Sequence, residues 1–216
     1  GHFVLCDAGA NPDSRPQHLV HNAILASHYA EVILDIRSPR IGLLTIGTEE
    51  GKGNERVQGA HHFLKQVGDI IHYQGLIEGF QVFENHVDVV VCDGFVGNIV
   101  LKSCEGLFRF LKDTLTEEIK ANPVRQFGAL LSIGAYRNLK TRVNPEQYGG
   151  ARLLGLRGHV FKAHGNSNRY AVAGALKIAL AVAKHDMTDI IRDEIEQANR
   201  VMNPAEFAEP ARETAS

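Results

Sequence analysis

The sequence has few cysteines, little net charge and no long apolar run. The three cysteines, Cys6, Cys92 and Cys104, show no C-x-x-C spacing and cannot all pair, which argues against a secreted disulfide scaffold and a zinc ribbon. No apolar run approaches the roughly 18 residues of a membrane span, and no leader pattern precedes the first strand. The formal charge of -2 gives no global attraction for nucleic acid. We therefore expect a cytoplasmic protein that binds no nucleic acid.

Apolar runs of strand length alternate with helical patterns along the first half of the chain. Strands are expected at residues 3–6, 41–46, 70–73 and 87–92, and helices at 17–34 and 54–67. The last strand is a continuous β-branched run, which is typical of a strand buried on both faces. This alternation predicts an α/β fold with a doubly wound, mostly parallel sheet.

The second half is mainly helical. From Asn98 an apolar stripe continues until Asn122-Pro123 breaks it, and a second helix is expected at 124–139. Between Ile119 and Pro145 there are five basic residues and no acidic one, so residues 104–143 form a cationic, apolar helical hairpin. Short strands near 153–156 and 159–162 and helices at 168–185 and 187–199 follow. We expect one domain over residues 1–202 and a disordered tail over 203–216.

A glycine-rich segment joins the second strand to the next helix. Gly51, Lys52, Gly53 and Asn54 combine backbone N–H groups that can approach an anion closely, a helix start and a cation. A phosphate fits such a loop. The alternative is a simple glycine turn in which Asn54 caps the helix.

Two other strand ends resemble each other, because each places Cys-Asp before small residues and an asparagine. The first carries Asp7 and Asn11. The second holds the candidate residues Asp93, Gly94, Gly97 and Asn98. We expect both turns at one edge of the sheet, where α/β proteins bind ligands. Asn98 either caps a helix or reaches a ligand, and the aspartates either act on a ligand or make local turn bonds.

A third junction places Lys162, His164 and Gly165 before a small polar turn that opens a helix. A cation, an imidazole and N–H groups at one helix start favour an anion or oxyanion site. The alternative is that Ser167 or Asn168 only caps the helix.

The sequence shows no covalent nucleophile and no metal site. No serine elbow is present, and no cysteine has an activating context. His61 and His62 are adjacent, and adjacent helix residues point about 100° apart, so they do not form a metal-ligand pair. This favours direct attack by a bound substrate.

These junctions, read in order, resemble the PlsX family of bacterial phosphate acyltransferases, enzymes of phospholipid synthesis. The resemblance rests on residues 7–11, 42–55, 89–98, 148–151 and 162–165, and so spans nearly the whole chain. The family usually continues His-Gly with Ser-Ser-Asp, where this chain has Asn166-Ser167-Asn168. The family's N-terminal portion, with its Met-Gly-Gly-Asp segment, is not in this chain, so the resemblance covers the C-terminal part of a longer enzyme.

The resemblance implies an isocitrate dehydrogenase-like fold with the hairpin projecting from it. It implies transfer of a long-chain acyl group from acyl carrier protein to inorganic phosphate, without a cofactor. His164, Lys52 and Asn98 become the candidate catalytic residues. The candidate phosphate- and substrate-binding residues are Gly51, Gly53, Asn54, Asp93, Gly94, Gly97, Lys162, Gly165, Asp7 and Asn11.

The family resemblance also favours a homodimer whose hairpin touches an anionic membrane. The candidate contact residues are Phe127, Leu130, Leu131, Tyr136 and Arg137. The acidic acyl carrier protein is another partner for this surface, the membrane glycerol-3-phosphate acyltransferase is a further one, and dimer packing is the structural alternative.

Three other interpretations stay open. One is a short-chain phosphate acyltransferase acting on acyl-coenzyme A. A nicotinamide enzyme of the isocitrate dehydrogenase type is weaker, because the dinucleotide fingerprint is lacking. The third is a catalytically incompetent fragment that keeps dimerisation and membrane contact.

Overall fold

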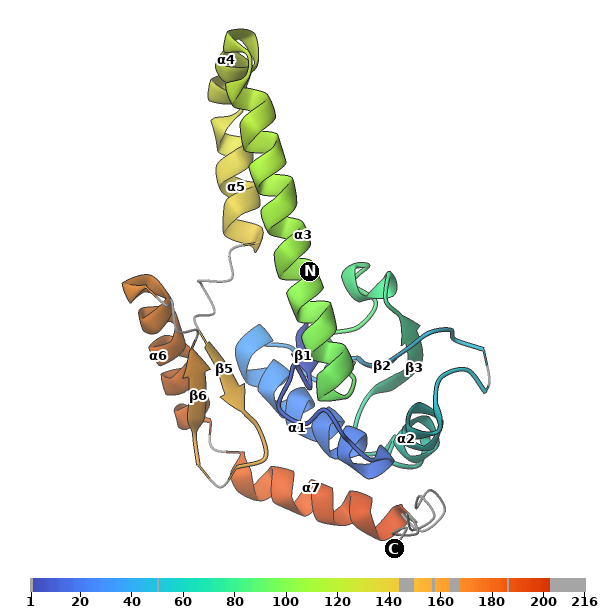
Figure 1. Ribbon diagram of the computed structural model, residues 1–216. Coiled ribbons are helices and arrows are strands. Elements are labelled where there is room, and N and C mark those ends of the chain that lie inside the picture. Colours follow the sequence, from blue (N-terminus) through green and yellow to red (C-terminus); the bar gives the residue numbers. More distant parts are fainter. Residues whose placement is uncertain are drawn as a thin grey trace, which may run out of the picture. The chain divides into compact units, whose positions relative to one another are not determined.

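The computed structural model describes residues 2–49, 51–143, 150–156, 158–163, 168–185 and 187–202 (Figure 1). The chain forms two compact units. The first contains Gly1–Asn98, Arg152–Val160 and Ala179–Ser216, and the second contains Ile99–Ala151 and Phe161–Ile178. The tail expected to be disordered, residues 203–216, lies outside the described residues.

The first unit is built on a four-stranded parallel sheet. Its strands are β1 (Val4–Cys6), β2 (Ile41–Thr45), β3 (Tyr73–Glu78) and β4 (Val89–Val91), in the order β1-β4-β2-β3. β4 pairs with β1 through Val4 and Val89, and with β2 through Ile41 and Val89. The predicted α/β fold with a parallel sheet is confirmed.

The core lies between this sheet and two helices, α1 (Pro16–Leu34) and α2 (Glu55–Gln66). Ile41 and Leu43 lie two positions apart in β2, as do Val89 and Val91 in β4, so all four point to one face. They pack in one cluster with residues of both helices, including the fully buried Phe63. A third helix, α7 (Thr188–Val201), packs against α1, where His21 Nε2 lies 2.8 Å from Asn199 Oδ1. Flanking helices thus cover the apolar side chains of the sheet.

The amino ends of β2 and β4 are joined by an ion pair. Asp88 Oδ2 accepts hydrogen bonds from the backbone N–H and the Nε of Arg40, both at 2.9 Å, and Oδ1 accepts one from Nη2 at 3.0 Å. The Arg40 hydrogen bonds hold the pKa of the Asp88 carboxyl below its ordinary value. This pair fixes where the two central strands begin.

The third strand differs from the prediction. We expected it at 70–73, but β3 is Tyr73–Glu78. Ile71 is instead buried in the turn that follows α2, where its N–H donates to the Val67 carbonyl. The apolar pair 70–71 therefore fills the core from a turn, and the less apolar segment after it forms the strand.

The first helix of the second half begins earlier than predicted. α3 is Gly94–Lys120, so Gly94 and Gly97 are helical. The second predicted helix is divided into α4 (Pro123–Leu131) and α5 (Ile133–Val143). Asn122 stops one helix and starts the next, because its side chain accepts a hydrogen bond from Val124 N–H at 2.8 Å.

Two short strands and a helix complete the chain. β5 (Gly150–Leu153) and β6 (Val160–Ala163) form a two-stranded sheet. We expected a strand at 153–156, but β5 ends at Leu153, because Gly155 turns the chain with a φ of 78°. α6 is Arg169–Lys184, close to the prediction. A single-turn 3-10 helix, η1 (Gln81–Phe83), lies between β3 and β4.

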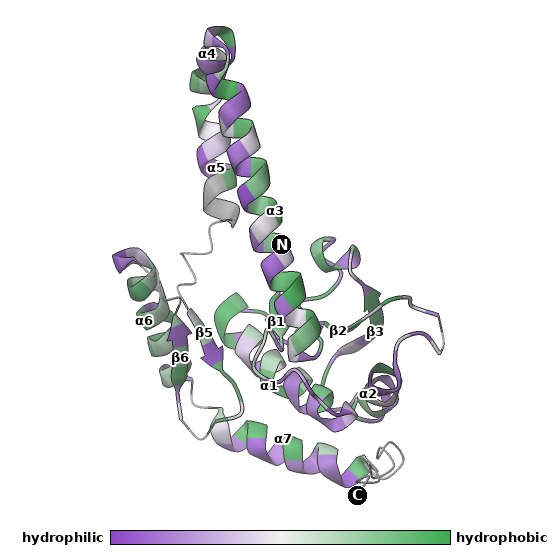
Figure 2. Cartoon of the chain, in the orientation of Figure 1, coloured by the Kyte–Doolittle hydropathy of each residue, from purple (hydrophilic) through white to green (hydrophobic). Residues whose placement is uncertain are grey.

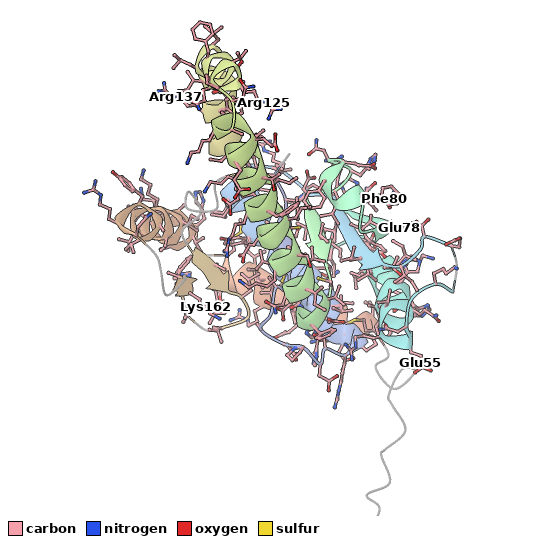
Figure 3. All side chains as sticks on the ribbon, turned by 45° about the horizontal axis from the view of Figure 1, so that its top comes forward. Glu55, Glu78, Phe80, Arg125, Arg137 and Lys162 are labelled. Atoms are coloured by element: carbon pink, nitrogen blue, oxygen red, sulfur yellow. The ribbon has the colours of Figure 1, made fainter. Side chains whose placement is uncertain are left out.

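α4 in the second unit contains both hydrophobic and hydrophilic residues (Figure 2), and four of its large apolar side chains are exposed. Val124 is 77% exposed, Phe127 63%, Leu130 62% and Leu131 74%. Arg125 belongs to α4 and Arg137 to α5, and both are labelled toward the same end of the hairpin (Figure 3). Among the described residues, every helix is too short or too polar to cross a membrane.

Candidate functional site

Three strand-to-helix junctions of the first unit lie at one edge of its sheet. β1, β4 and β2 are parallel neighbours, so their carboxyl ends meet there. The segments that leave these strands are residues 7–11, 93–98 and 47–54. The sheet therefore brings together most of the residues that the sequence singles out.

Asp7 folds the segment after β1 around its own carboxylate. Its Oδ1 accepts hydrogen bonds from the N–H groups of Gly9 at 2.8 Å and Ala10 at 2.7 Å, and its Oδ2 accepts one from Asn11 at 2.7 Å. Asp7 itself is buried, and the peptide bond between Cys6 and Asp7 is cis. These three backbone N–H groups already donate to the Asp7 carboxylate, so they are not available to bind an anion. This is the local turn bonding that the sequence left open for Asp7.

Asp93 caps α3. Its Oδ1 accepts a hydrogen bond from Val96 N–H at 2.8 Å. The N–H of Gly94 donates to the carbonyl oxygen of Asn11 at 2.9 Å, and a Cβ on Gly94 would lie 2.7 Å from that oxygen. The N–H groups of Gly94 and Val96, in the first turn of α3, therefore already have hydrogen-bond partners within the protein.

Gly97 allows α3 to pass directly against the end of β1. A Cβ at this position would lie 1.8 Å from the Asp7 carbonyl oxygen and 2.9 Å from Cys92 Sγ. Only glycine fits there. Asn98 is the next residue and lies inside α3, so the alternative in which it caps the helix is wrong. Its exposed side chain stays next to Gly9, where a Cβ would lie 3.3 Å from Asn98 Oδ1.

Arg56 links two of the junctions and was missed by the sequence analysis. Its Nη1 donates to Asp93 Oδ2 at 3.1 Å, and its Nη2 donates to Asp13 Oδ1 at 3.0 Å. Arg56 follows Glu55 at the start of α2, so the bond to Asp93 ties this start to that of α3. A cation just inside a predicted helix start is a signal that the sequence contains. Its partner depends on the strand order, which the sequence does not show.

The loop after β2 contains a cationic side chain, that of Lys52. Lys52 is exposed, and its N–H donates to the Glu49 carbonyl at 3.1 Å. Gln58 Nε2 donates to the carbonyl oxygens of Gly51 at 2.8 Å and Gly53 at 3.1 Å. The N–H and C=O of a trans peptide point in opposite directions. The N–H of Asn54 therefore points away from Gln58.

Asn54 is the N-cap of α2, as one alternative predicted. Its Oδ1 accepts a hydrogen bond from Val57 N–H at 2.9 Å. Before it, Gly53 adopts a φ of 88°, and a Cβ there would lie 3.0 Å from Thr45 Oγ1. This hydroxyl oxygen is buried and has no hydrogen-bond partner among the described residues. The loop thus packs closely on the end of β2.

The third predicted junction is described only as far as Ala163. Lys162 is exposed in β6, in the second unit (Figure 3). A Cβ on Gly150 would lie 2.9 Å from the Lys162 carbonyl oxygen. His164 and Gly165 lie outside the described residues.

The two cysteines beside the aspartates are not poised as nucleophiles. Cys6 and Cys92 are both buried free thiols. Burial, helped by the charge of Asp7, raises the pKa of the Cys6 thiol to about 12. Burial, followed by the nearby Cys6 and Asp93, raises the pKa of Cys92 as well. A protonated thiol is a weak nucleophile.

The adjacent histidines on α2 have separate partners. His61 Nδ1 lies 2.7 Å from the Tyr73 hydroxyl, and His62 Nε2 lies 2.8 Å from Gln66 Nε2. Burial raises the pKa of Tyr73. Within the part of the chain that the structure describes, no group of three or more histidine, cysteine or acidic side chains is arranged to hold a metal ion.

Comparison with known proteins covers both the sheet and the junctions. A family model described as "Fatty acid synthesis protein" matches residues 1–190. The chain is 41% identical to the phosphate acyltransferase of Janthinobacterium sp. (strain Marseille) over 197 residues, which are 90% of this chain and 55% of the relative. It is 42% identical to that of Nitrosococcus oceani over 196 residues, covering 91% and 57%. For Legionella pneumophila (strain Corby) the identity is 40% over 195 residues, covering 90% and 57%.

These matches agree with the resemblance seen in the motifs. The chain spans about half the length of the curated relatives that it matches. The matched residues include all three junctions of the first unit and both strands β5 and β6. The chain therefore belongs to the PlsX family of phosphate acyltransferases, whose model describes its members as fatty acid synthesis proteins.

Proposed function

We propose that this protein transfers a long-chain acyl group from the thioester of acyl carrier protein to inorganic phosphate. The observation that carries this proposal is the match to relatives named phosphate acyltransferase, about 41% identical over 90% of the chain. The junctions at the sheet edge support it, because they place a cation and a helix start beside one another.

The phosphate site is centred on the loop after β2. The backbone N–H groups after β1 donate to the Asp7 carboxylate. At the start of α3, the N–H groups donate to Asp93 and to the Asn11 carbonyl oxygen. The loop from Gly51 to Asn54 instead carries the exposed Lys52, and Gln58 turns its carbonyls inward. Asp7, Asn11, Asp93, Gly94 and Gly97 then act by shaping the neighbouring junctions, and Arg56 joins them as a positioning residue.

The reaction needs no covalent enzyme intermediate. A phosphate oxygen attacks the thioester carbonyl, the new C–O bond forms, and the C–S bond breaks. The carrier leaves as a thiol after taking up the proton that phosphate loses. Lys52 holds the phosphate, while Asn98 and His164 stabilise the oxyanion or carry the proton. Lys162 and Gly165 complete the anion site in this proposal.

The second part of the proposal is a contact between the apolar hairpin and a membrane. We assign Phe127, Leu130, Leu131, Tyr136 and Arg137 to the surface that meets an anionic membrane. The protein then acts as a cytoplasmic, peripherally bound homodimer, and hands the acyl phosphate to a membrane acyltransferase. Residues 1–202 form one functional domain that includes the hairpin 104–143, and its sheet is part of a doubly wound, isocitrate dehydrogenase-like fold.

The test is a substitution of Lys52, the cation in the loop after β2. Lys52→Ala is expected to lower kcat/KM for phosphate about 10- to 100-fold, because a hydrogen bond to a charged group contributes about 1.5–3 kcal/mol. The assay follows acyl phosphate formed from acyl carrier protein thioester and phosphate, with acyl-coenzyme A as the competing donor.

Lys65→Ala provides the matched control, since Lys65 is an exposed lysine in the last turn of α2, the helix that follows the loop of Lys52. Its kinetics should match those of the unchanged protein. Equal kinetics for Lys52→Ala would remove the loop from the phosphate site. A folded chain that forms no acyl phosphate would favour the incompetent fragment, and faster turnover of acyl-coenzyme A would favour the short-chain enzyme.

A further inference from the structure

Three exposed apolar side chains lie at the edge of the sheet where the loop of Lys52 begins. Ile46 directly follows β2, Phe80 lies two residues after β3, and Phe95 is the second residue of α3, which follows β4. They are 83%, 62% and 61% exposed. β4, β2 and β3 are parallel neighbours, so their carboxyl ends span two strand spacings, or about 10 Å. We call these three residues the apolar edge.

The core of the first unit is packed on both faces of the sheet without the apolar edge. α1 and α2 cover one face. On the other face a Cβ on Gly42 would lie 2.8 Å from Ile77 Cγ2 and 3.0 Å from Val87 Cγ1, and both of these side chains are buried. Phe83 of η1 has the ring of Phe3 as its neighbour, with centroids 5.9 Å apart. Apolar residues that gather on a surface, beside a core that does not need them, indicate a binding surface.

The apolar edge adjoins the cation of the loop. A Cβ on Gly47 would lie 3.2 Å from Lys52 Cγ and 3.5 Å from Lys52 Cδ, so the aliphatic stem of Lys52 lies against Gly47. Ile46 is the preceding residue, and consecutive Cα atoms are about 3.8 Å apart. An apolar group attached close to a phosphate at Lys52 therefore lies next to Ile46.

The charges around the apolar edge favour an uncharged ligand. Every charged residue within four positions of it in the sequence is acidic, and these residues are Glu49, Glu50, Glu78, Glu84 and Asp93. Glu78 ends β3 (Figure 3), and Asp93 is paired with Arg56. Lys52 is the cation that the proposed function assigns to phosphate. With Lys52 engaged, a second anion such as a free fatty acid is repelled, whereas the uncharged acyl chain of a thioester is not.

The proposed reaction fixes where the acyl chain starts. Attack requires the phosphate oxygen and the thioester carbonyl carbon to lie about 3–3.5 Å apart. With phosphate at Lys52, the carbonyl carbon lies beside the same loop, and the first methylene groups leave from that point. Ile46 is the exposed apolar side chain next to the loop, and Phe80 and Phe95 extend the surface over the neighbouring strands. The acyl chain therefore meets the apolar edge.

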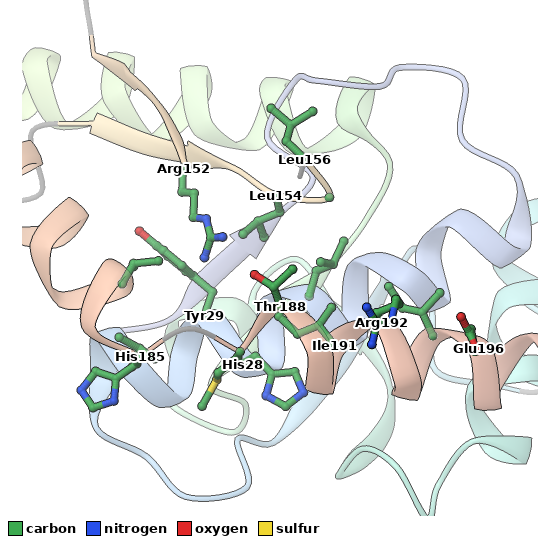
Figure 4. A pocket seen from close by; sticks show the side chains of 16 residues that line it. His28, Tyr29, Arg152, Leu154, Leu156, His185, Thr188, Ile191, Arg192 and Glu196 are labelled. Carbon is green, nitrogen blue, oxygen red and sulfur yellow. The ribbon is translucent and has the colours of Figure 1, made fainter. Parts of the chain in front are cut away.

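A cavity of about 560 Å³ in the first unit is a second candidate for the acyl chain (Figure 4). Its walls come from α1, the β5 region, the end of α6 and α7. α1 begins at the carboxyl edge of the sheet, and its cavity residues, Leu25 to Val32, lie roughly 13–24 Å along the helix from Pro16. The first carbons of a chain whose carbonyl is at the loop cannot lie there. The lining also includes titratable side chains, namely His28, Tyr29, Arg152, His185, Arg192 and Glu196.

We propose that Ile46, Phe80 and Phe95 bind the acyl chain of the thioester substrate and set a preference for long chains. This inference rests on the proposed function, because it takes the loop of Lys52 as the phosphate site. The first carbons lie against Ile46, and later carbons lie against Phe80 and Phe95. Each methylene group that leaves water strengthens binding about fourfold, so the apolar edge favours long acyl chains over short ones.

Kinetics with donors of two lengths test the apolar edge. The assay compares the hexadecanoyl and butanoyl thioesters of acyl carrier protein. A double variant with Phe80→Ser and Phe95→Ser should lower kcat/KM for hexadecanoyl at least about tenfold and for butanoyl less than about twofold. Ile46→Ser should lower kcat/KM for both donors, because a four-carbon chain still contacts Ile46. KM for phosphate should stay unchanged in both variants.

Ile190→Ser is the matched control, since Ile190 is 52% exposed on α7 of the same unit. It should turn over both donors like the unchanged protein. If the double variant loses activity equally with both donors, or loses none, the proposal is wrong while the proposed function stands. Unchanged turnover together with a changed molecular mass in solution would assign the apolar edge to a contact between copies and overturn the proposal as well.

A second measurement does not depend on turnover. The protein is irradiated with acyl carrier protein that bears a hexadecanoyl chain containing a diazirine, and the labelled peptides are identified by mass spectrometry. Label is expected in residues 46–49, 79–84 and 94–98. Label in 25–32 or 188–196 would place the acyl chain in the cavity, and this result, label on α4 or no label would each overturn the proposal. Label at the apolar edge without any acyl phosphate would instead reject the proposed function and keep the binding surface.

Discussion

At the scale of single residues, two glycines of the strand-to-helix junctions, Gly94 and Gly97, allow close packing of the backbone. Glycine-rich loops at strand ends are usually interpreted as places where a phosphate approaches the backbone. Here Gly94 and Gly97 instead let one junction approach another, since a side chain on either would meet the backbone of the segment after β1. The two aspartates act in the same way, because their carboxylates hold loop and helix donors.

Gly97→Ala tests this packing role. The added methyl group would lie 1.8 Å from the Asp7 carbonyl oxygen, so the backbone must move. We expect a loss of about 3 kcal/mol in the free energy of unfolding, at the upper end of overpacking costs. Urea denaturation followed by circular dichroism measures it.

Gly106→Ala is the control in the same helix. Nothing lies within 4 Å of a Cβ at this exposed position of α3. This variant should be more stable by about 0.5–1 kcal/mol, since alanine is the better helix former. Similar midpoints for the two variants would mean that α3 does not pass against β1 as described.

At the scale of elements, the sheet is held at both ends by polar contacts. The carboxyl ends of β1 and β4 are linked through the Asn11 carbonyl and Gly94. The amino ends of β2 and β4 are linked by Arg40 and Asp88. The Asp88 side chain is 8% exposed, so its charge depends on this partner.

Asp88 makes the stability of the folded protein depend on pH, and the lowered pKa of Asp88 gives the direction of this dependence. The pKa of Asp88 is lowered by the Arg40 hydrogen bonds, so the folded state binds its proton less readily than the unfolded state. Its stabilisation is complete above the ordinary value of 3.8 and is lost as pH falls through the lowered pKa. Asp88→Asn should lower stability at pH 7 by about 1–3 kcal/mol and make it less dependent on pH between about 4 and 2.

Urea midpoints measured across this pH range check the prediction. Asp113→Asn, at an exposed position of α3, controls for the general effect of losing a carboxylate. If Asp88→Asn and the unchanged protein lose stability in parallel on acidification, Asp88 is not the group responsible.

At the scale of the whole molecule, the chain divides its tasks between two units. The first holds the sheet, the junctions and the cavity, and the second holds α4 and α5 with their exposed apolar side chains. A soluble unit rarely exposes so many large apolar residues on one short helix without a use. The membrane contact proposed for the hairpin explains them.

Leu131→Glu is expected to reduce binding to anionic vesicles at least about tenfold. Leu131 is 74% exposed on α4, and a carboxylate there would be repelled by the lipid charge and costly to bury. Sedimentation with phosphatidylglycerol vesicles measures binding, and raised salt should weaken the binding of the unchanged protein.

Leu176→Glu is the matched control, because Leu176 is 65% exposed on α6 of the same unit. It should sediment like the unchanged protein. Equal binding of all three proteins would assign the exposed face of α4 to a protein partner or to the dimer.

Local patterns in the sequence determined the elements and the family. Continuous β-branched residues predicted β4, Asn122-Pro123 predicted a break between two helices, and the ordered junction motifs identified the PlsX family. The N-cap at Asn54 was one of two alternatives for its loop. These signals depend on neighbouring residues, so they need no knowledge of the fold. The β3 position was missed because Ile70 and Ile71 are apolar for packing in a turn.

Only the tertiary structure shows which polar groups already have hydrogen-bond partners within the protein. The strand order β1-β4-β2-β3 places Asn11 against Gly94 and Arg56 against Asp93, residues far apart in the sequence. It also brings α1, the β5 region and α7 around one cavity. Contacts of this kind depend on how distant segments pack, which no local pattern encodes. For this reason the glycine-rich loops could be found in the sequence, but the loop that we propose as the phosphate site could be chosen only from the fold.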